Sequence, residues 1–244
     1  MHCFFIDPDQ IQNDFIVVTG SEARHISGAL RMAPGSEVEL FDGKGCRLRG
    51  VITEISPGKV RVNIVDRRTE PLPKTPLILA QAMLKGKKMD FLIQKATELG
   101  VHSFQPLLTR FCEKKKHNSR QAERWQRIML EACKQCGRAL PMEICEPLTL
   151  DCCEFDQESS LLMPWENEKS RRLSPALLRR NHPVWLLIGP EGGFHDSEAA
   201  LARKLGFTTV SLGSRILRAE TAALTCTSIV QYLSGALDPP ELQK

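Results

Sequence analysis

The segment from Trp185 to Ala222 constrains the fold of this chain more than any other part of the sequence. It contains an apolar run, a glycine-rich loop, an amphipathic stretch, a second short apolar run and a second loop before an apolar helix. A strand that leads into a loop and then into a helix, twice in succession, is typical of a parallel sheet. The carboxyl ends of such strands share one edge of the sheet. The sequence therefore predicts two neighbouring loops that bind a ligand there.

The first of these loops has the sequence Gly-Pro-Glu-Gly-Gly-Phe at residues 189–194. Gly189, Gly192 and Gly193 lack side chains, so a ligand can approach the main chain closely. Pro190 stiffens the turn between them. The chain has neither a Gly-x-Gly-x-x-Gly motif after the first α/β strand nor a Gly-x-x-x-x-Gly-Lys-Ser/Thr motif, so a phosphate cradle is not supported. One glycine-rich turn alone would equally fit a plain strand-to-helix connection, whereas two such loops favour a binding site.

The periodicity of the apolar residues changes along the chain and predicts two domains. Residues 1–70 contain short alternating runs with tight turns, which predict a small antiparallel barrel with one helix over 23–32. Three prolines in residues 67–76 indicate a linker. Residues 71–244 alternate between strands and helices, as expected for an α/β domain with a mostly parallel sheet. Its strands are expected near residues 77–80, 104–108, 160–163, 184–188 and 208–212, and Ser119 and Ser174-Pro175 are expected helix starts.

Positive charge is concentrated in two segments, although the formal net charge of the chain is only +4. Residues 44–74 carry eight basic and three acidic side chains, and residues 110–138 carry nine and three. Basic faces of this kind suit RNA, although ordinary solvated surfaces have similar compositions. The sequence has no run of about eighteen apolar residues and its start does not resemble a signal peptide. We therefore expect a cytosolic protein without a membrane span.

Nine cysteines are present, and we expect them to be free thiols because the number is odd and no export signal precedes them. Cys133 and Cys136 have a spacing that also occurs in redox and zinc sites. On a helix, however, both fall on an apolar stripe with Met129 and Ala132. No second pair of cysteines or histidines completes a set of four ligands, so we expect no metal site.

Motifs over nearly the whole chain resemble those of the SPOUT-class RNA methyltransferases, and within that class those of the RsmE family. The two ligand loops carry the clearest part of this resemblance. Cys136 stands where the family more often has serine, and His195 stands where serine usually caps the helix after Phe194. We therefore expect Asp196 to cap this helix, because its carboxylate can accept hydrogen bonds from the first turn. The other similar segments are residues 85–90, 94–101, 124–138 and 162–166, together with His25 and Leu30-Arg31.

The resemblance implies a SPOUT-type parallel sheet with a C-terminal trefoil knot, preceded by a PUA-like β-barrel that binds RNA. It also implies S-adenosylmethionine as cofactor, methylation of N3 of a uridine in 16S (small-subunit) ribosomal RNA, and a homodimer whose active sites are completed by the partner. The apolar final helix, residues 222–233, is consistent with burial in a subunit interface. The cofactor-binding residues expected on this basis are Met163, Pro164, Ile188, Gly189, Pro190, Gly192, Gly193, Leu212, Gly213, Ile216, Leu217 and Ala222.

Methylation of uracil N3 requires removal of a proton or stabilisation of the uracil anion. Arg218 is the first catalytic candidate, as a fixed cation beside that anion. Glu191 and Glu220 are candidates for a base or an orienting acceptor. Each has a structural alternative: Arg218 can pair with a glutamate, and Glu220 suits the first turn of a helix. The expected RNA-binding residues are Arg24, His25 and Arg31 on the N-terminal helix, and Arg49.

Two other classes of protein remain open from the sequence. One is a non-catalytic RNA-binding protein of the same fold, against which the intact cofactor loop argues. The other is a nucleotide-dependent oxidoreductase, which the missing dinucleotide fingerprint disfavours.

Overall fold

The structure is a computed structural model that describes residues 2–112 and 119–238. The chain forms two compact units. The first contains Met1–Pro71 and Leu130–Pro141, and the second contains Leu72–Met129 and Met142–Lys244. The C-terminal part of helix α3 (Ser119–Cys136) therefore packs with the N-terminal unit, an association that its helical pattern did not indicate.

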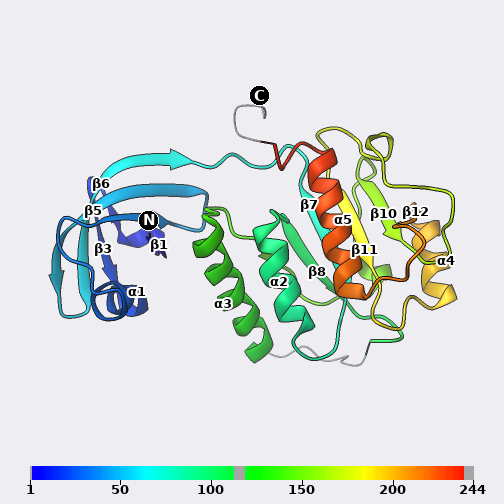
Figure 1. The fold of residues 1–244 in the computed structure, drawn as a ribbon, viewed down its shortest axis with the longest axis horizontal. Coiled ribbons are helices and arrows are strands. Elements are labelled where there is room, and N and C mark those ends of the chain that lie inside the picture. The colour runs from blue at the N-terminus through cyan, green and yellow to red at the C-terminus, as the bar shows by residue number, and fades with distance from the viewer. Residues whose placement is uncertain (1, 113–118, 239–244) are drawn as a thin grey trace. The chain divides into compact units, whose positions relative to one another are not determined.

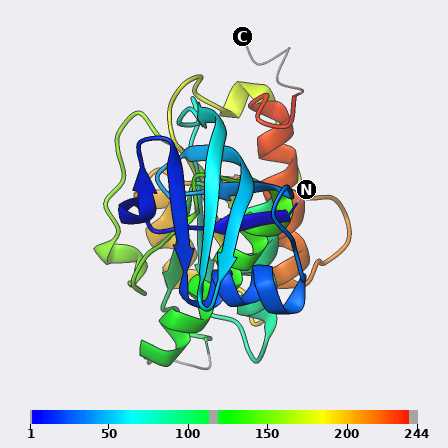
Figure 2. The ribbon, with the colours of Figure 1, turned by 90° about the vertical axis from the view of Figure 1, so that its left-hand side faces the viewer.

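The N-terminal unit contains a six-stranded sheet with the strand order β1-β4-β5-β6-β3-β2. Figure 2 shows its strands facing the viewer, with the short helix α1 beside their ends. All neighbours are antiparallel, as predicted, except β1 and β4, which pair in parallel. The alternation of Val60, Arg61 and Val62 buries both valines and exposes the arginine. The strands are β1 (His2–Phe5), β2 (Ile11–Gln12), β3 (Phe15–Thr19), β4 (Glu37–Phe41), β5 (Cys46–Ser56) and β6 (Lys59–Thr69), with one 3-10 turn, η1 (Pro8–Gln10).

The helix expected over residues 23–32 begins and ends earlier. Helix α1 (Gly20–Arg24) continues directly into one π-helical turn, η2 (His25–Ala29). Arg31 lies beyond this turn with a φ of 49°, a left-handed conformation that a helix cannot contain. Arg24 and His25 are therefore helical as expected, but the placement of Arg31 on the helix was wrong.

The second unit is built on a sheet whose neighbouring strands all pair in parallel, as predicted. Its strand order is β12-β10-β11-β7-β8-β9. Every residue of β7 is buried, as expected for a strand covered on both faces. The strands are β7 (Leu77–Ala82), β8 (Ser103–Leu107), β9 (Glu143–Ile144), β10 (Ser160–Pro164), β11 (Val184–Ile188) and β12 (Thr208–Val210).

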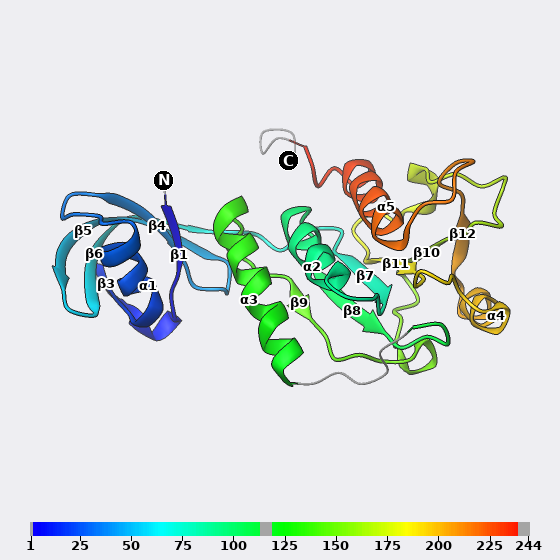
Figure 3. The ribbon, with the colours of Figure 1, turned by 60° about the horizontal axis from the view of Figure 1, so that its bottom comes forward.

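Helices cover both faces of this sheet (Figures 1 and 3). Helices α2 (Lys88–Glu98) and α5 (Ala219–Leu233) pack together on one face, and α5 also contacts β7 and β11. Helix α4 (Asp196–Lys204) covers the other face, where Ala199 and Ala202 join Met163, Leu187 and Phe207 in one core. The chain thus returns from the edge strand β12 to the middle of the sheet through residues 211–218.

Two short 3-10 turns lie in the second unit, η3 (Leu150–Cys152) and η4 (Pro175–Leu177). The helix start expected at Ser174-Pro175 produces only this single turn, and the Ser174 side chain caps nothing there. None of the helices in the described residues is long and apolar enough to cross a membrane.

Candidate active site

Loops that follow three neighbouring parallel strands contact one another at the carboxyl edge of the second sheet. The loop after β10 runs alongside β12, because the backbone N–H of Trp165 donates to Val210 O at 3.0 Å and that of Ser211 donates to Arg171 O at 2.7 Å. The loops after β11 (189–194) and β12 (211–218) are the two ligand loops that the sequence predicted. Their common edge is the usual position of a ligand site in a parallel sheet.

Glu168 fixes the loop after β10. Its carboxylate accepts hydrogen bonds from the backbone N–H groups of Ser170 and Arg171 and from the Thr209 hydroxyl of β12. These bonds, led by the one from the Ser170 backbone, lower the pKa of Glu168 to about 2. Sequence reasoning did not identify this residue, because its partner Thr209 lies 41 positions further along the chain.

The glycines of the ligand loops differ in what surrounds them. A Cβ on Gly189 would lie 3.2 Å from the Phe194 ring, and one on Gly192 would lie 3.2 Å from Phe111 Cβ. At both positions the missing side chain makes room for protein. Gly213 has a φ of +107° and nothing within 4 Å of a Cβ position. The open approach to main chain that we expected therefore exists at Gly213, while Gly192 packs against Phe111.

The second loop also presents main-chain hydrogen-bonding groups. Within residues 2–112 and 119–238, the backbone N–H groups of Leu212, Ile216 and Leu217 have no hydrogen-bond partner. The Ile216 side chain is 89% exposed. By contrast, Met163, Ile188 and Pro190 are buried. Pro164 ends β10, Gly193 adopts a φ of +72°, and Ala222 lies in the first turn of α5.

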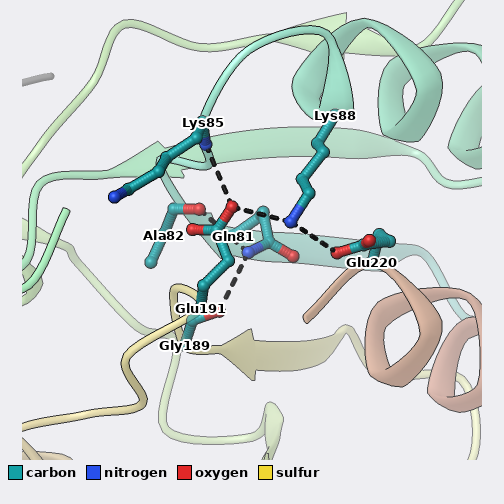
Figure 4. Close-up of polar contacts among 7 residues, drawn as sticks. All are labelled: Gln81, Ala82, Lys85, Lys88, Gly189, Glu191 and Glu220. Atoms are coloured by element: carbon teal, nitrogen blue, oxygen red, sulfur yellow. Dashed lines mark hydrogen bonds and ion pairs between the residues drawn. The ribbon is translucent and has the colours of Figure 1, made fainter. Parts of the chain in front are cut away.

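A lysine that sequence reasoning did not single out connects the two glutamates. Lys88 Nζ lies 2.9 Å from Glu191 Oε1 and 3.5 Å from Glu220 Oε2 (Figure 4). The backbone N–H of Lys85 also donates to Glu191 Oε1 at 3.2 Å. Lys88 thereby joins α2, the loop after β11 and the first turn of α5. The motif that contains it was part of the family resemblance, but its partners are more than 100 residues away.

The buried side chain of Gln81, at the end of β7, holds the same loop at its start (Figure 4). Its Nε2 donates to Ala82 O at 2.9 Å and to Gly189 O at 3.2 Å. Both acceptors are carbonyl oxygens, so the orientation of the amide is determined by its partners. Gly189 is therefore held in position by Gln81 of β7 as well as by its own strand, β11.

The electrostatic state of this cluster follows from its pairing. Hydrogen bonding to Glu191 raises the pKa of Lys88, which stays protonated at neutral pH. Partial burial raises the pKa of Glu191, but the hydrogen bonds from Lys88 and from the Lys85 backbone outweigh it, and the pKa lies below its ordinary value. Glu191 is consequently a stable carboxylate, which makes it a weak base.

Arg218 lies outside this cluster. It is exposed and is the residue that directly precedes helix α5. In the part of the chain that the structure describes, Arg218 forms no ion pair, so the alternative that it braces a glutamate is not supported. Its guanidinium is available to a ligand at the end of the second loop.

The cap of helix α4 differs from the expectation. His195, rather than Asp196, is the N-cap: its Nδ1 accepts from the Ser197 N–H at 3.2 Å, and the Glu198 carboxylate accepts from the His195 N–H at 2.9 Å. This reciprocal pair is a capping box in which the imidazole replaces a hydroxyl. The other ring nitrogen, Nε2, lies 2.9 Å from an Arg110 guanidinium nitrogen.

The expected RNA-binding residues fall in two places of the N-terminal unit. Arg24, His25 and Arg31 are exposed around η2, where the His25 ring packs edge-on against Phe4 at 5.9 Å. Arg49 is exposed on β5 and lines a cavity of about 400 Å³. The other residues of this cavity are Glu39, Arg47, Asp66, Arg68, Thr69 and Glu70. Residues 113–118 of the second basic segment lie outside the described residues.

The nine cysteines are free thiols. Cys133 is buried as expected, and burial raises its pKa to about 12. Cys136 is exposed, so its assignment to the apolar stripe was wrong. The helix ends at this residue, which leaves its side chain at the margin of the packed face.

Comparison with known proteins agrees with this architecture. Residues 70–231 match the family model of the RNA methyltransferase domain, and residues 18–65 match that of the RNA methyltransferase PUA domain. Ribosomal RNA small subunit methyltransferase E of Synechocystis is 34% identical over 89% of this chain and 73% of its own length. The Aquifex aeolicus protein of the same name is 33% identical over 94% of this chain and 99% of its own.

Solved structures show the same two-part fold. Ribosomal RNA small subunit methyltransferase E from Neisseria gonorrhoeae, bound to S-adenosylmethionine, has a TM-score of 0.85 and 28% identity over 96% of this chain and 98% of its own. A Legionella pneumophila protein in complex with the same cofactor has a TM-score of 0.77 and 31% identity over 94% of this chain and 96% of its own. Fold and domain order define the class of RNA methyltransferases with an N-terminal PUA domain. Within that class, the chain belongs to the ribosomal RNA small subunit methyltransferase E family.

The residues of the loops fit the cofactor that these two structures contain. S-adenosylmethionine consists of a nucleoside, a sulfonium and an amino acid, and it requires main-chain partners and an apolar surface more than a phosphate cradle. The free N–H groups of Leu212, Ile216 and Leu217 and the open face of Gly213 supply the former. The exposed Ile216 side chain supplies apolar surface beside them.

Proposed function

We propose that this protein uses S-adenosylmethionine to methylate N3 of a specific uridine in 16S ribosomal RNA. The observation that carries this proposal is the open second loop. There, Gly213 and neighbouring N–H groups lie next to Arg218, and neither these groups nor the Arg218 guanidinium has a partner among the residues that the structure describes. The names of the relatives, which are small-subunit ribosomal RNA methyltransferases, support the substrate class.

The cofactor would supply an activated methyl group on its sulfonium, so the chain itself must bind and orient the uracil and favour loss of its N3 proton. We assign Arg218 to the electrostatic part of this task. A guanidinium at the end of the second loop favours the uracil anion as it develops, which is the state that matters for the rate. Its exposure leaves it free to contact the RNA.

We assign Glu191 and Glu220 to positioning rather than to proton removal. Both carboxylates face Lys88, and the pKa of Glu191 is below its ordinary value, so protonation of this group near neutral pH is unfavourable. A carboxylate in this state accepts a proton poorly. Its hydrogen bonds fix the cofactor loop instead.

The other parts of the molecule suit the same activity. The N-terminal unit, with Arg24, His25, Arg31 and Arg49, would bind RNA, in the cytoplasm where ribosomes assemble. We infer a homodimer formed through α5, since the aromatic side chain of Tyr232 near the end of this helix is 69% exposed. A trefoil knot formed by the return of the chain to α5 is part of this proposal.

The test is mass spectrometry of the modified nucleosides in 16S ribosomal RNA from a strain that lacks the gene. The deletion should remove one N3-methyluridine, and the wild-type gene, but not Arg218→Ala, should restore it. Calorimetry of the purified protein with S-adenosylmethionine and with NADH completes the test. Retention of the modification, or absence of cofactor binding, would refute the proposal and favour a non-catalytic RNA-binding protein.

A further inference from the structure

A phenylalanine lies exposed against the cofactor loop. The Phe111 side chain follows β8 and is 47% exposed, although its Cβ packs where a side chain on Gly192 would lie. Its ring meets the His195 ring edge-on at 5.8 Å. One side of the ring is therefore supported by the loop after β11, and a large part of it faces solvent.

The polar neighbours of Phe111 are held in fixed positions. The Arg110 guanidinium lies 2.9 Å from His195 Nε2, and the Arg110 backbone N–H donates to Glu198 Oε1 at 2.8 Å. His195 itself is fixed as the cap of α4. The Phe111 ring, the Arg110 guanidinium and the His195 imidazole thus lie on one rigid surface, which we call the Phe111 platform.

A hollow adjoins the platform. Arg110 lines a cavity of about 470 Å³ together with Thr109, Glu198 and the apolar side chains of Leu108 and Leu201. The volume falls in the range of small-molecule sites, roughly 300–1,000 Å³. Its lining, which also includes Thr149, Leu150 and Asp151, combines apolar side chains with polar and charged ones.

We propose that the Phe111 platform stacks an unpaired base of the substrate RNA beside the target nucleotide. This inference rests on the proposed function. Exposed aromatic rings and arginine side chains are the groups on which single-stranded RNA bases stack, and the base faces are recognised whatever the sequence. The platform contacts the loop that would hold the cofactor, so RNA delivered to that loop must pass over or next to it.

The charge of the surface favours RNA over a protein partner. Arg110 carries a cation next to the ring, where its guanidinium lies 2.9 Å from His195 Nε2. A second copy of this chain would bring the same arginine to the interface. Repulsion between like charges disfavours that arrangement.

The experiment compares Phe111→Ala with Phe111→Trp in the full-length protein. The control is Phe91→Ala, since Phe91 on α2 is 44% exposed but is not part of the platform. Probes are unmethylated small ribosomal subunits and a short single-stranded RNA that contains 2-aminopurine, whose fluorescence is quenched by stacking. The same oligonucleotide with abasic sites reports contacts to the backbone alone.

We expect Phe111→Ala to weaken binding of both base-containing RNAs about 5- to 30-fold, to lose the quenching and to leave binding of the abasic RNA unchanged. Phe111→Trp should restore affinity and quenching, and Phe91→Ala should behave as wild type. Affinity for S-adenosylmethionine, measured separately, should change less than threefold in Phe111→Ala.

The inference would be overturned if Phe111→Ala lost as much affinity for abasic RNA as for base-containing RNA, or if its RNA affinity were unchanged. A change in oligomeric state without a change in RNA affinity would also overturn it. These outcomes leave the proposed function intact as long as wild-type protein methylates the subunit. If wild-type protein binds neither RNA nor cofactor, that result refutes the proposed function itself, and the stacking inference falls with it.

Discussion

Replacement of Lys88 by methionine removes the cation that joins α2 to Glu191 and Glu220 but keeps most of the apolar stem. The pairs are partly exposed, with side-chain exposures of 34% for Lys88, 27% for Glu191 and 16% for Glu220. Such pairs contribute about 0.2–1 kcal/mol each. Loss of both, with the carboxylates left uncompensated, should cost about 1–2 kcal/mol, which corresponds to a factor of about 5 to 30.

This loss should appear in cofactor binding, because the loop after β11 must then be ordered when the ligand binds. Calorimetry should therefore show a dissociation constant for S-adenosylmethionine about 5- to 30-fold higher in Lys88→Met. Lys88→Arg should retain most of the affinity. Lys87→Met is the matched control, since Lys87 is the exposed neighbour that precedes α2 and forms no contact with either glutamate in the described residues. Affinity of Lys88→Met within twofold of wild type would refute the reasoning.

The pH dependence of the same effect has a defined sign. The pKa of Glu191 is lowered, so its contribution is present above the ordinary glutamate value of about 4.3 and is lost as the pH falls through the lowered value. The pKa of Lys88 is raised, so its contribution is complete below 10.5 and is lost as the pH rises beyond that. The difference in affinity between wild type and Lys88→Met should therefore be constant between about pH 5 and pH 10.

Four further substitutions test other parts of the proposal. Arg218→Ala should lower the single-turnover rate of methyl transfer about 100- to 1,000-fold at saturating cofactor. A rate near wild type would show that Arg218 has a structural role and not a catalytic one. Gly213→Ala should weaken S-adenosylmethionine binding about 5- to 30-fold in calorimetry, since a left-handed backbone costs other residues roughly 1–2 kcal/mol; Gly192→Val should instead lower the melting temperature, because its side chain would collide with Phe111. Arg49→Glu should weaken RNA binding more at low than at high salt in filter-binding assays without altering cofactor affinity, and insensitivity to the change would exclude this face from RNA docking.

The positions of the strands could be predicted from local patterns wherever burial was continuous, whereas their order in the sheet could not. The bounds expected for β11 agree with the structure, because Val184–Ile188 is an apolar run between a proline and a glycine. The strand expected at residues 208–212 ends at Val210, since the following residues leave the sheet for the second loop. The parallel arrangement was predictable from the alternation of strands and helices.

Side-chain partners could not be predicted in the same way. Lys88 was visible only as one of several lysines near a helix start, and nothing local indicates that its partners are 103 positions away or further. The position of Phe111 beside Gly192 likewise depends on the neighbouring ends of β8 and β11 across β7. Local composition also misplaced the cap of α4, because the ring nitrogen Nδ1 of His195 accepts the capping hydrogen bond that we expected at Asp196.

The arrangement separates the groups that can bind a ligand from those that fix their positions. Groups of the first kind are main-chain atoms of residues 212–217, which a substitution alters only indirectly. Groups of the second kind lie outside that loop: Gln81 and Lys88 hold the loop after β11, and Glu168 holds the loop after β10 against β12. Because backbone groups depend on their supports for position, changes at Lys88 or Glu168 should affect cofactor binding more than changes to most exposed loop side chains do. A sequence search for ligand-binding residues therefore finds the loops, whereas the side chains that determine their geometry become evident only from the fold.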